Sequence, residues 1–172
     1  MHSLKKSFGI SQKNNPYPLV AAKDFAKSKH KLLYIGRIID ANLNRVKEGL
    51  RVCEEITRFI LDNHKITAGL KQVRHKIDSL GSKIYPPAKL FSQRRAQADV
   101  GRFNSCGELK RANCKDIFWA NIQRVKESLR VLEEFSKLID ARAAIGFKQL
   151  RYKVYEIEKE SFKKISALPD SR

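Results

Sequence analysis

Acidic side chains are in short supply in this chain. Its 172 residues include 36 lysines and arginines but only 18 aspartates and glutamates, which gives a formal net charge of +18. So large an excess of positive charge favours anionic partners, such as nucleic acids, anionic membrane surfaces or small phosphorylated ligands.

Cysteine is also scarce, and the three that occur are Cys53, Cys106 and Cys114. An odd number of cysteines, in no metal-ligand spacing, argues against a disulfide framework and against a structural metal site. Free thiols are typical of a reducing compartment, so we expect a cytoplasmic protein.

Long hydrophobic runs are missing. No stretch approaches the roughly 20 apolar residues of a membrane span, so no membrane partner is expected. The lysines near the start of the chain are not followed by an apolar stretch, so the sequence predicts no secretory signal. The loops G-x-x-x-x-G-K-S/T and G-x-G-x-x-G do not occur either, which excludes the familiar phosphate-binding loops.

The composition is otherwise that of a globular domain, with 42% hydrophobic and 31% charged residues. A chain of this length can bury one hydrophobic core. The first 31 residues differ, because they contain seven lysines but a single acid, Asp24, and two prolines, Pro16 and Pro18. We expect residues 1–31 to form a basic, mobile tail, followed by a single helical domain over residues 32–168.

The domain contains an internal repeat. Residues 41–55 return as residues 120–134, with eleven of fifteen positions identical at an offset of 79. A second pair of segments, residues 70–77 and 147–154, matches at an offset of 77. A change of two residues between the segments is easily absorbed by a loop, so the sequence indicates a duplicated unit of two segments.

Both segments of each copy have the apolar period of an amphipathic helix. The sequence Asp62-Asn63-His64 breaks the first copy, Asp140-Ala141-Arg142 breaks the second, and Asp116 is the expected N-cap of the third helix. We therefore predict an all-α helical bundle of two tandem helical hairpins with pseudo-two-fold symmetry, one over residues 37–84 and one over residues 116–165.

A long connection over residues 85–115 joins the two hairpins. It contains Pro86-Pro87, the pair Arg94-Arg95, and Asp99 followed by Val100 and Gly101. A connection of this length inside a compact domain is usually functional or disordered, and its arginine content favours function.

Polar side chains interrupt the apolar arc of the long helices at equivalent positions in both copies. Winding the helices at 100° per residue places two of each set within the arc and one at its edge. The six side chains are Asn42, Arg45 and Glu48 in the first copy and Asn121, Arg124 and Glu127 in the second. The same winding assigns Glu54 to the solvated face.

An arginine that faces inward has to be paired or has to meet an anion. One interpretation is therefore an internal ion pair in each copy, Arg45 with Glu48 and Arg124 with Glu127. The other is a polar pocket between the long helices whose arginines bind phosphate oxygens.

The sequence from Arg37 to Arg45, which continues into Glu48-Gly49-Leu50-Arg51-Val52, resembles the small hydroxymethylpyrimidine-phosphate kinases of thiamine biosynthesis. The resemblance extends through residues 70–77, Asp99-Val100-Gly101 and residues 120–134, and covers roughly residues 37–159. These kinases occur alone or fused to thiamine-phosphate synthase.

The resemblance implies an enzyme that transfers the γ-phosphoryl group of ATP to hydroxymethylpyrimidine phosphate, with Mg²⁺ as the metal. It assigns Arg45, Arg124 and Arg94 to phosphate oxygens. Asp99 and one of Glu48 or Glu127 would hold Mg²⁺ directly or through water.

The resemblance also implies a role for Asn42 and Asn121, which would form hydrogen bonds with the edge of the pyrimidine ring or orient the arginines. Arg45, Arg124 and Asp99 are thus the catalytic candidates, and Asp99 and Glu48 are the metal candidates.

Two rival functions stay open. A basic helical module that binds nucleic acid fits the composition, but the repeated arginines are predicted to face inward and no helix carries a basic stripe free of glutamates. A non-catalytic partner domain of thiamine-phosphate synthase fits the departures from the family in the connection, Arg95 and Arg102. A homodimer is compatible with the kinase and with both rival functions.

Overall fold

A computed structural model describes residues 29–94, 99 and 111–169, and this part of the chain forms helices and no strand. The helices are α2 (Lys29–Phe59), α3 (His64–Ile84), α4 (Pro87–Gln93), α5 (Cys114–Ser136) and α6 (Ala141–Ser166).

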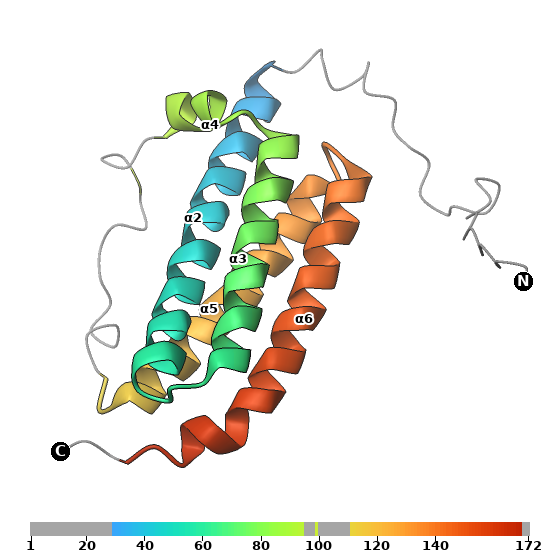
Figure 1. The fold of residues 1–172 in the computed structure, drawn as a ribbon. Helices are drawn as coiled ribbons and strands as arrows, with labels where there is room; N and C mark the ends of the chain where they lie inside the picture. Colours follow the sequence, from blue (N-terminus) through green and yellow to red (C-terminus); the bar gives the residue numbers. More distant parts are fainter. Residues whose placement is uncertain (1–28, 95–98, 100–110, 170–172) are drawn as a thin grey trace, which may run out of the picture.

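The four long helices form an antiparallel bundle (Figure 1). The hairpin of α2 and α3 packs against the hairpin of α5 and α6, through contacts of α2 with α5 and of α3 with α6. The short helix α4 packs on α2, at the end of the bundle where α2 begins and α3 ends (Figure 1). The prediction of an all-α bundle of two tandem hairpins is confirmed.

Side-chain caps define where the helices begin. Asn63 accepts a hydrogen bond from the backbone N–H of Ile66 at the start of α3, and Asp140 accepts one from Arg142 at the start of α6. Both lie at the breaks that the sequence predicts. The N-cap of α5 is Asn113 and not Asp116, because Asn113 has the extended backbone of a capping residue and its side chain accepts from the N–H of Asp116.

The predicted tail and connection are only partly within the described residues. The helix α2 begins at Lys29, so the last three residues of the predicted tail belong to it, and residues 1–28 lie outside the described part. The connection begins with helix α4, which packs its buried Gln93 against Gly36 of α2. Residues 95–98 and 100–110, including Arg95 and Arg102, are outside the described part.

The two halves meet along the seam between α2 and α5. Val46 and Val125, which are equivalent in the repeat, are both fully buried. Closer to the end of α2, Gly49 lies against the backbone of Asn121, and the thiol of Cys53 lies 3.8 Å from the carbonyl oxygen of Phe118. Burial raises the pKa of the Cys53 thiol to about 12, so this cysteine is an inert part of the core.

Gly49 permits the close approach of α2 and α5. A Cβ at this position would lie 2.9 Å from Cγ2 of Val125 and 3.0 Å from the carbonyl oxygen of Asn121. We expect Gly49→Ala to lower the free energy of unfolding by about 1–2 kcal/mol, because the strain at a helix backbone exceeds the gain in helix propensity.

Urea denaturation followed by circular dichroism measures this effect. The matched control is Gly69→Ala, whose Cβ would meet only the flexible tip of Ile157 at 3.3 Å, and which should be neutral or slightly stabilising. Equal stability of the two variants would contradict the close contact at Gly49.

Each hairpin is also held by a buried ion pair that the sequence analysis did not predict. Glu54 is only 4% exposed and accepts hydrogen bonds from Arg74 of α3 at 2.7 and 3.2 Å. Glu133 is likewise 4% exposed and accepts from Arg151 of α6 at 3.1 and 2.8 Å. The assignment of Glu54 to the solvated face was therefore wrong, because a polar side chain on a helix can be buried by a partner on the next helix.

Candidate functional site

The duplicated polar residues lie on the outer side of the α2–α5 pair. Arg45 and Arg124 are exposed, as are Glu48 and Glu127. The predicted inward direction of the arginines was wrong. Gly49 contacts α5. At 100° per residue, Arg45 and Val46 lie on either side of Gly49 around the helix axis. Val46 points into the core, so Arg45 points away from it. The repeat places Arg124 in the same way on α5.

The asparagines of the motif are more deeply placed than the arginines. Asn42 is 6% exposed and Asn121 is partly buried. Each donates its side-chain N–H to the carbonyl four residues earlier in its own helix, Ile38 and Ile117 respectively, at 2.8 Å. The amide groups are thus held in the same orientation in both copies, and each keeps a carbonyl oxygen as an acceptor.

The arginines of this outer face are not neutralised by the acids of the motif. Neither Arg45 with Glu48 nor Arg124 with Glu127 forms an ion pair, although the sequence analysis held such pairs open. Glu127 instead accepts a hydrogen bond from Gln123 at 2.8 Å. The exposed guanidinium groups of Arg45 and Arg124 are therefore able to bind an anion with several oxygens.

Arg94 is held beside α2 by Asp40. Its Nε and Nη2 donate to the two carboxylate oxygens of Asp40 at 2.8 and 2.7 Å. This hydrogen bonding raises the pKa of Arg94, and the negative charge of Glu48 contributes to the shift. Arg94 therefore lies within electrostatic reach of the outer face, and 41% of its side chain stays exposed.

Asp40 is a buried acid that the sequence analysis did not select. It is 7% exposed and also accepts a hydrogen bond from Asn44 at 3.4 Å. A signal was present in the repeat, because Trp119 occupies the equivalent position of the second copy. Such a change between two otherwise similar copies indicates that their surroundings differ at this point.

A cleft of about 140 Å³ lies at the junction of α2, α3 and α4. Asp40 and Lys47 line it from α2, Asp78 and Gly81 from α3, and Arg94 follows α4. Three helices converge on this cleft, so a small ligand could be contacted from several sides.

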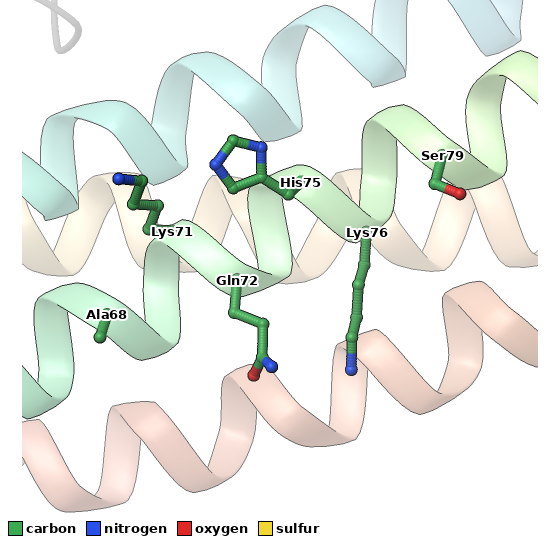
Figure 2. A pocket seen from close by; sticks show the side chains of 6 residues that line it. All are labelled: Ala68, Lys71, Gln72, His75, Lys76 and Ser79. Atoms are coloured by element: carbon green, nitrogen blue, oxygen red, sulfur yellow. The ribbon is translucent and has the colours of Figure 1, made fainter.

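A wider depression of about 410 Å³ lies on the surface of α3. Figure 2 shows that its side chains, among them Lys71, His75 and Lys76, are spread along a single helix and do not converge. His75 is exposed there, and among the described residues the lining side chains all come from α3.

The residues proposed for Mg²⁺ are not gathered into a metal cluster. Among the described residues, no group of three or more histidine, cysteine, aspartate or glutamate side chains is placed to hold a metal ion. Glu48 and Asp99 are both exposed, and Asp99 has an interaction partner. One or two carboxylates together with nucleotide phosphates are the usual environment of Mg²⁺ in phosphotransferases, so single carboxylates such as Glu48 fit this ion.

Several thiamine-phosphate synthases are similar in sequence to this chain. That of Synechocystis is 41% identical over 125 residues, which cover 72% of this chain and 35% of the relative. That of Nostoc punctiforme is 42% identical over 123 residues, covering 71% and 34%. That of Rhodopirellula baltica is 35% identical over 133 residues, covering 77% and 35%.

The chain thus spans about a third of the length of these relatives. No solved structure matches it. Within the described part, none of the helices is long and apolar enough to cross a membrane. The ThiD2 family matches residues 37–160, which include all four repeated segments and end within the last two turns of α6. By this match and by its relatives, the chain belongs to the ThiD2 family.

Proposed function

We propose that this protein is a phosphotransferase of thiamine biosynthesis that uses ATP to phosphorylate hydroxymethylpyrimidine phosphate to the diphosphate. The family match, the names of the relatives and the resemblance over residues 37–159 support this assignment. The matched segment covers about a third of the synthases, which leaves room in those proteins for a second activity beside the synthase reaction.

The observation that carries the proposal is the pair of exposed arginines on the α2–α5 face. Arg45 and Arg124 occupy equivalent positions and neither is paired with the acid of its own motif. A reaction between two phosphorylated molecules brings several negative charges together. Guanidinium groups that are not already neutralised are well suited to bind them.

The chemistry asks for positioning and charge neutralisation and not for a strong base. The acceptor phosphate is already an anion near neutral pH, so its oxygen attacks the γ-phosphorus of ATP without losing a proton in that step. The bond from the γ-phosphorus to the β,γ-bridging oxygen breaks, and ADP leaves. Arg45 and Arg124 would bind the phosphate oxygens and hold the two reactants in line.

Mg²⁺ would supply further charge neutralisation on the nucleotide phosphates. Asp99, together with Glu48 or Glu127, would hold it, and all three carboxylates are exposed. Asn42 and Asn121 would orient the neighbouring arginines through the acceptor oxygens of their amides. Arg94 would approach the acceptor phosphate from the side of α4.

A second candidate function is a non-catalytic partner domain of thiamine-phosphate synthase. It is supported by the limited extent of the match, which covers about a third of each relative. A nucleic-acid-binding module is less well supported. Acids are interleaved with the arginines of the long helices, as in the ion pairs of Arg51 with Glu55 and of Arg130 with Glu134.

ADP release from Mg-ATP tests the proposal. We expect turnover with hydroxymethylpyrimidine phosphate and the appearance of the diphosphate by mass spectrometry. The unphosphorylated pyrimidine alcohol should be turned over at least about 100-fold more slowly, because the arginines of the site would lack their anion. Binding of the synthase without turnover of either pyrimidine, by a folded helical sample, would favour the partner domain instead.

A further inference from the structure

The two hairpins of the repeat differ sharply at one place, the outer junction of their two helices. Of four equivalent positions, three carry an aspartate or a glycine in the first copy and a larger residue in the second, and the fourth is aromatic in both. The pairs are Asp40 and Trp119, Asp78 and Tyr155, Gly81 and Glu158, and Tyr85 and Phe162.

In the second hairpin these side chains fill the junction. The rings of Trp119 and Phe162 lie 5.7 Å apart, centroid to centroid. Lys126 forms a 2.6 Å ion pair with Glu158 and lies 6.0 Å from the centre of the ring of Tyr155. These contacts cover the junction of α5 and α6 with the protein's own side chains, of which Tyr155 and Phe162 remain exposed.

In the first hairpin the same junction is open. Gly81 has no side chain to place there, and Lys47, the equivalent of Lys126, pairs at 3.2 Å with Asp78 at the rim. The helix α4, which has no counterpart after α6 in the described residues, covers one end through Leu90 and Phe91. The result is the cleft of about 140 Å³.

The size of this cleft limits what it can hold. A cavity of about 150 Å³ accommodates a single benzene ring. The cleft is thus suited to one six-membered ring and is too small for a nucleotide.

The lining of the cleft specifies the kind of ring. The buried side chains of Leu43, Ile77 and Leu90 give apolar walls for the ring faces. Asp40 accepts hydrogen bonds only from Arg94 and Asn44 among the described residues, and a carboxylate has further acceptor capacity.

The carboxylates that line the cleft would accept hydrogen bonds from N–H groups of a ligand, and its arginine would bind an anionic group. Asp78 is about half exposed there and its charge is shared with Lys47. Arg94 also lines the cleft, and part of its side chain is exposed. A flat ring that carries an amino group and an anionic arm satisfies both requirements.

We propose that the cleft under α4 binds the aminopyrimidine ring of the phosphorylated acceptor, with Asp40 and Asp78 accepting from its N–H groups and Arg94 meeting its phosphate. The identity of the acceptor rests on the proposed function. The cleft then places the acceptor phosphate toward the outer face that carries Arg45, where the nucleotide phosphates would bind.

Binding of hydroxymethylpyrimidine phosphate in the absence of ATP, measured by titration calorimetry, tests this proposal. Ser82 lines the cleft and is exposed, so Ser82→Phe should fill the space without disturbing the core. We expect its affinity to fall at least about tenfold. The matched control is Lys159→Phe, at the equivalent exposed position of the second hairpin, which should bind within about twofold of the parent.

A second variant, Asp78→Asn, removes an acceptor charge without filling the cleft. We expect it to weaken binding by about tenfold, because a neutral amide oxygen accepts a weaker hydrogen bond than a carboxylate does. Circular dichroism confirms that each variant is folded.

The outcomes separate this proposal from the proposed function. If the parent protein binds the pyrimidine phosphate but forms no ADP, and Ser82→Phe loses this binding, the cleft is upheld and the kinase assignment is overturned. Turnover whose KM for the pyrimidine phosphate is unchanged in both variants would overturn the cleft and leave the kinase standing. Failure of the parent protein to bind the pyrimidine phosphate would overturn the cleft as well.

Discussion

Reversing the charge of Arg45 is expected to reduce the turnover of hydroxymethylpyrimidine phosphate by at least about 1,000-fold, the effect of losing a transition-state arginine. Arg45 is exposed, so Arg45→Glu should leave the helicity and the unfolding midpoint nearly unchanged. Arg124→Glu should have a similar effect, because the repeat places Arg124 on the same face.

The control for this experiment is Arg58→Glu, an exposed arginine of the same helix that contacts Phe59 and lies away from the α5 seam. It changes the net charge of the protein by the same amount and should leave turnover within about twofold of the parent, since exposed charges are weakly coupled over such distances in salt. If Arg45→Glu and Arg124→Glu both retained normal turnover, the outer α2–α5 face would not be the site of phosphoryl transfer.

Removing Arg74 is expected to cost about 3 kcal/mol of unfolding free energy, because it leaves the buried carboxylate of Glu54 without its main partner. The variant Arg74→Met keeps most of the side-chain volume and removes the charge. The double variant Glu54→Leu with Arg74→Met should recover most of the loss, since a buried ion pair is often replaceable by apolar residues. Urea denaturation of the parent, of Arg74→Met and of the double variant measures the loss of unfolding free energy and its recovery.

The second copy of the repeat supplies an internal comparison. After removal of Arg74, the remaining partner of Glu54 within the described residues is Arg51 at 3.4 Å, whereas after removal of Arg151 Glu133 keeps Arg130 at 2.9 Å. Arg151→Met should therefore be the less damaging substitution. A double variant at the first hairpin that is no more stable than Arg74→Met alone would show that the loss does not come from the unpaired acid.

Much of the fold followed from local features of the sequence. The repeat at residues 41–55 and 120–134 implies two similar units, and the apolar period of each segment implies helices. The break at Asp62–His64 was visible because polar residues interrupt the period. At α5 the cap was misplaced by three residues, since Asn113 and Asp116 are both good capping residues and only the backbone distinguishes them.

The candidate site was predicted less well. The sequence identified Arg45 and Arg124 as members of a repeated motif, but it assigned them to the interior, whereas both are exposed. A helical wheel gives the angle of a side chain on its own helix and says nothing about which neighbour covers that angle. Asp40 was passed over for the same reason, because its burial depends on Arg94, which follows it by 54 residues.

Taken alone, the sequence determined the helical content, the duplication and the repeated polar motif, because all three are encoded in local spacing. The tertiary structure decided which polar residues are buried, that Glu54 and Arg74 pair within the first hairpin, and that a cleft remains open there while aromatic side chains fill its counterpart. These properties depend on how one helix is placed against another. The residues at equivalent positions, such as Gly81 and Glu158, differ in this respect, because Gly81 leaves its junction open and Glu158 pairs with Lys126 across the other.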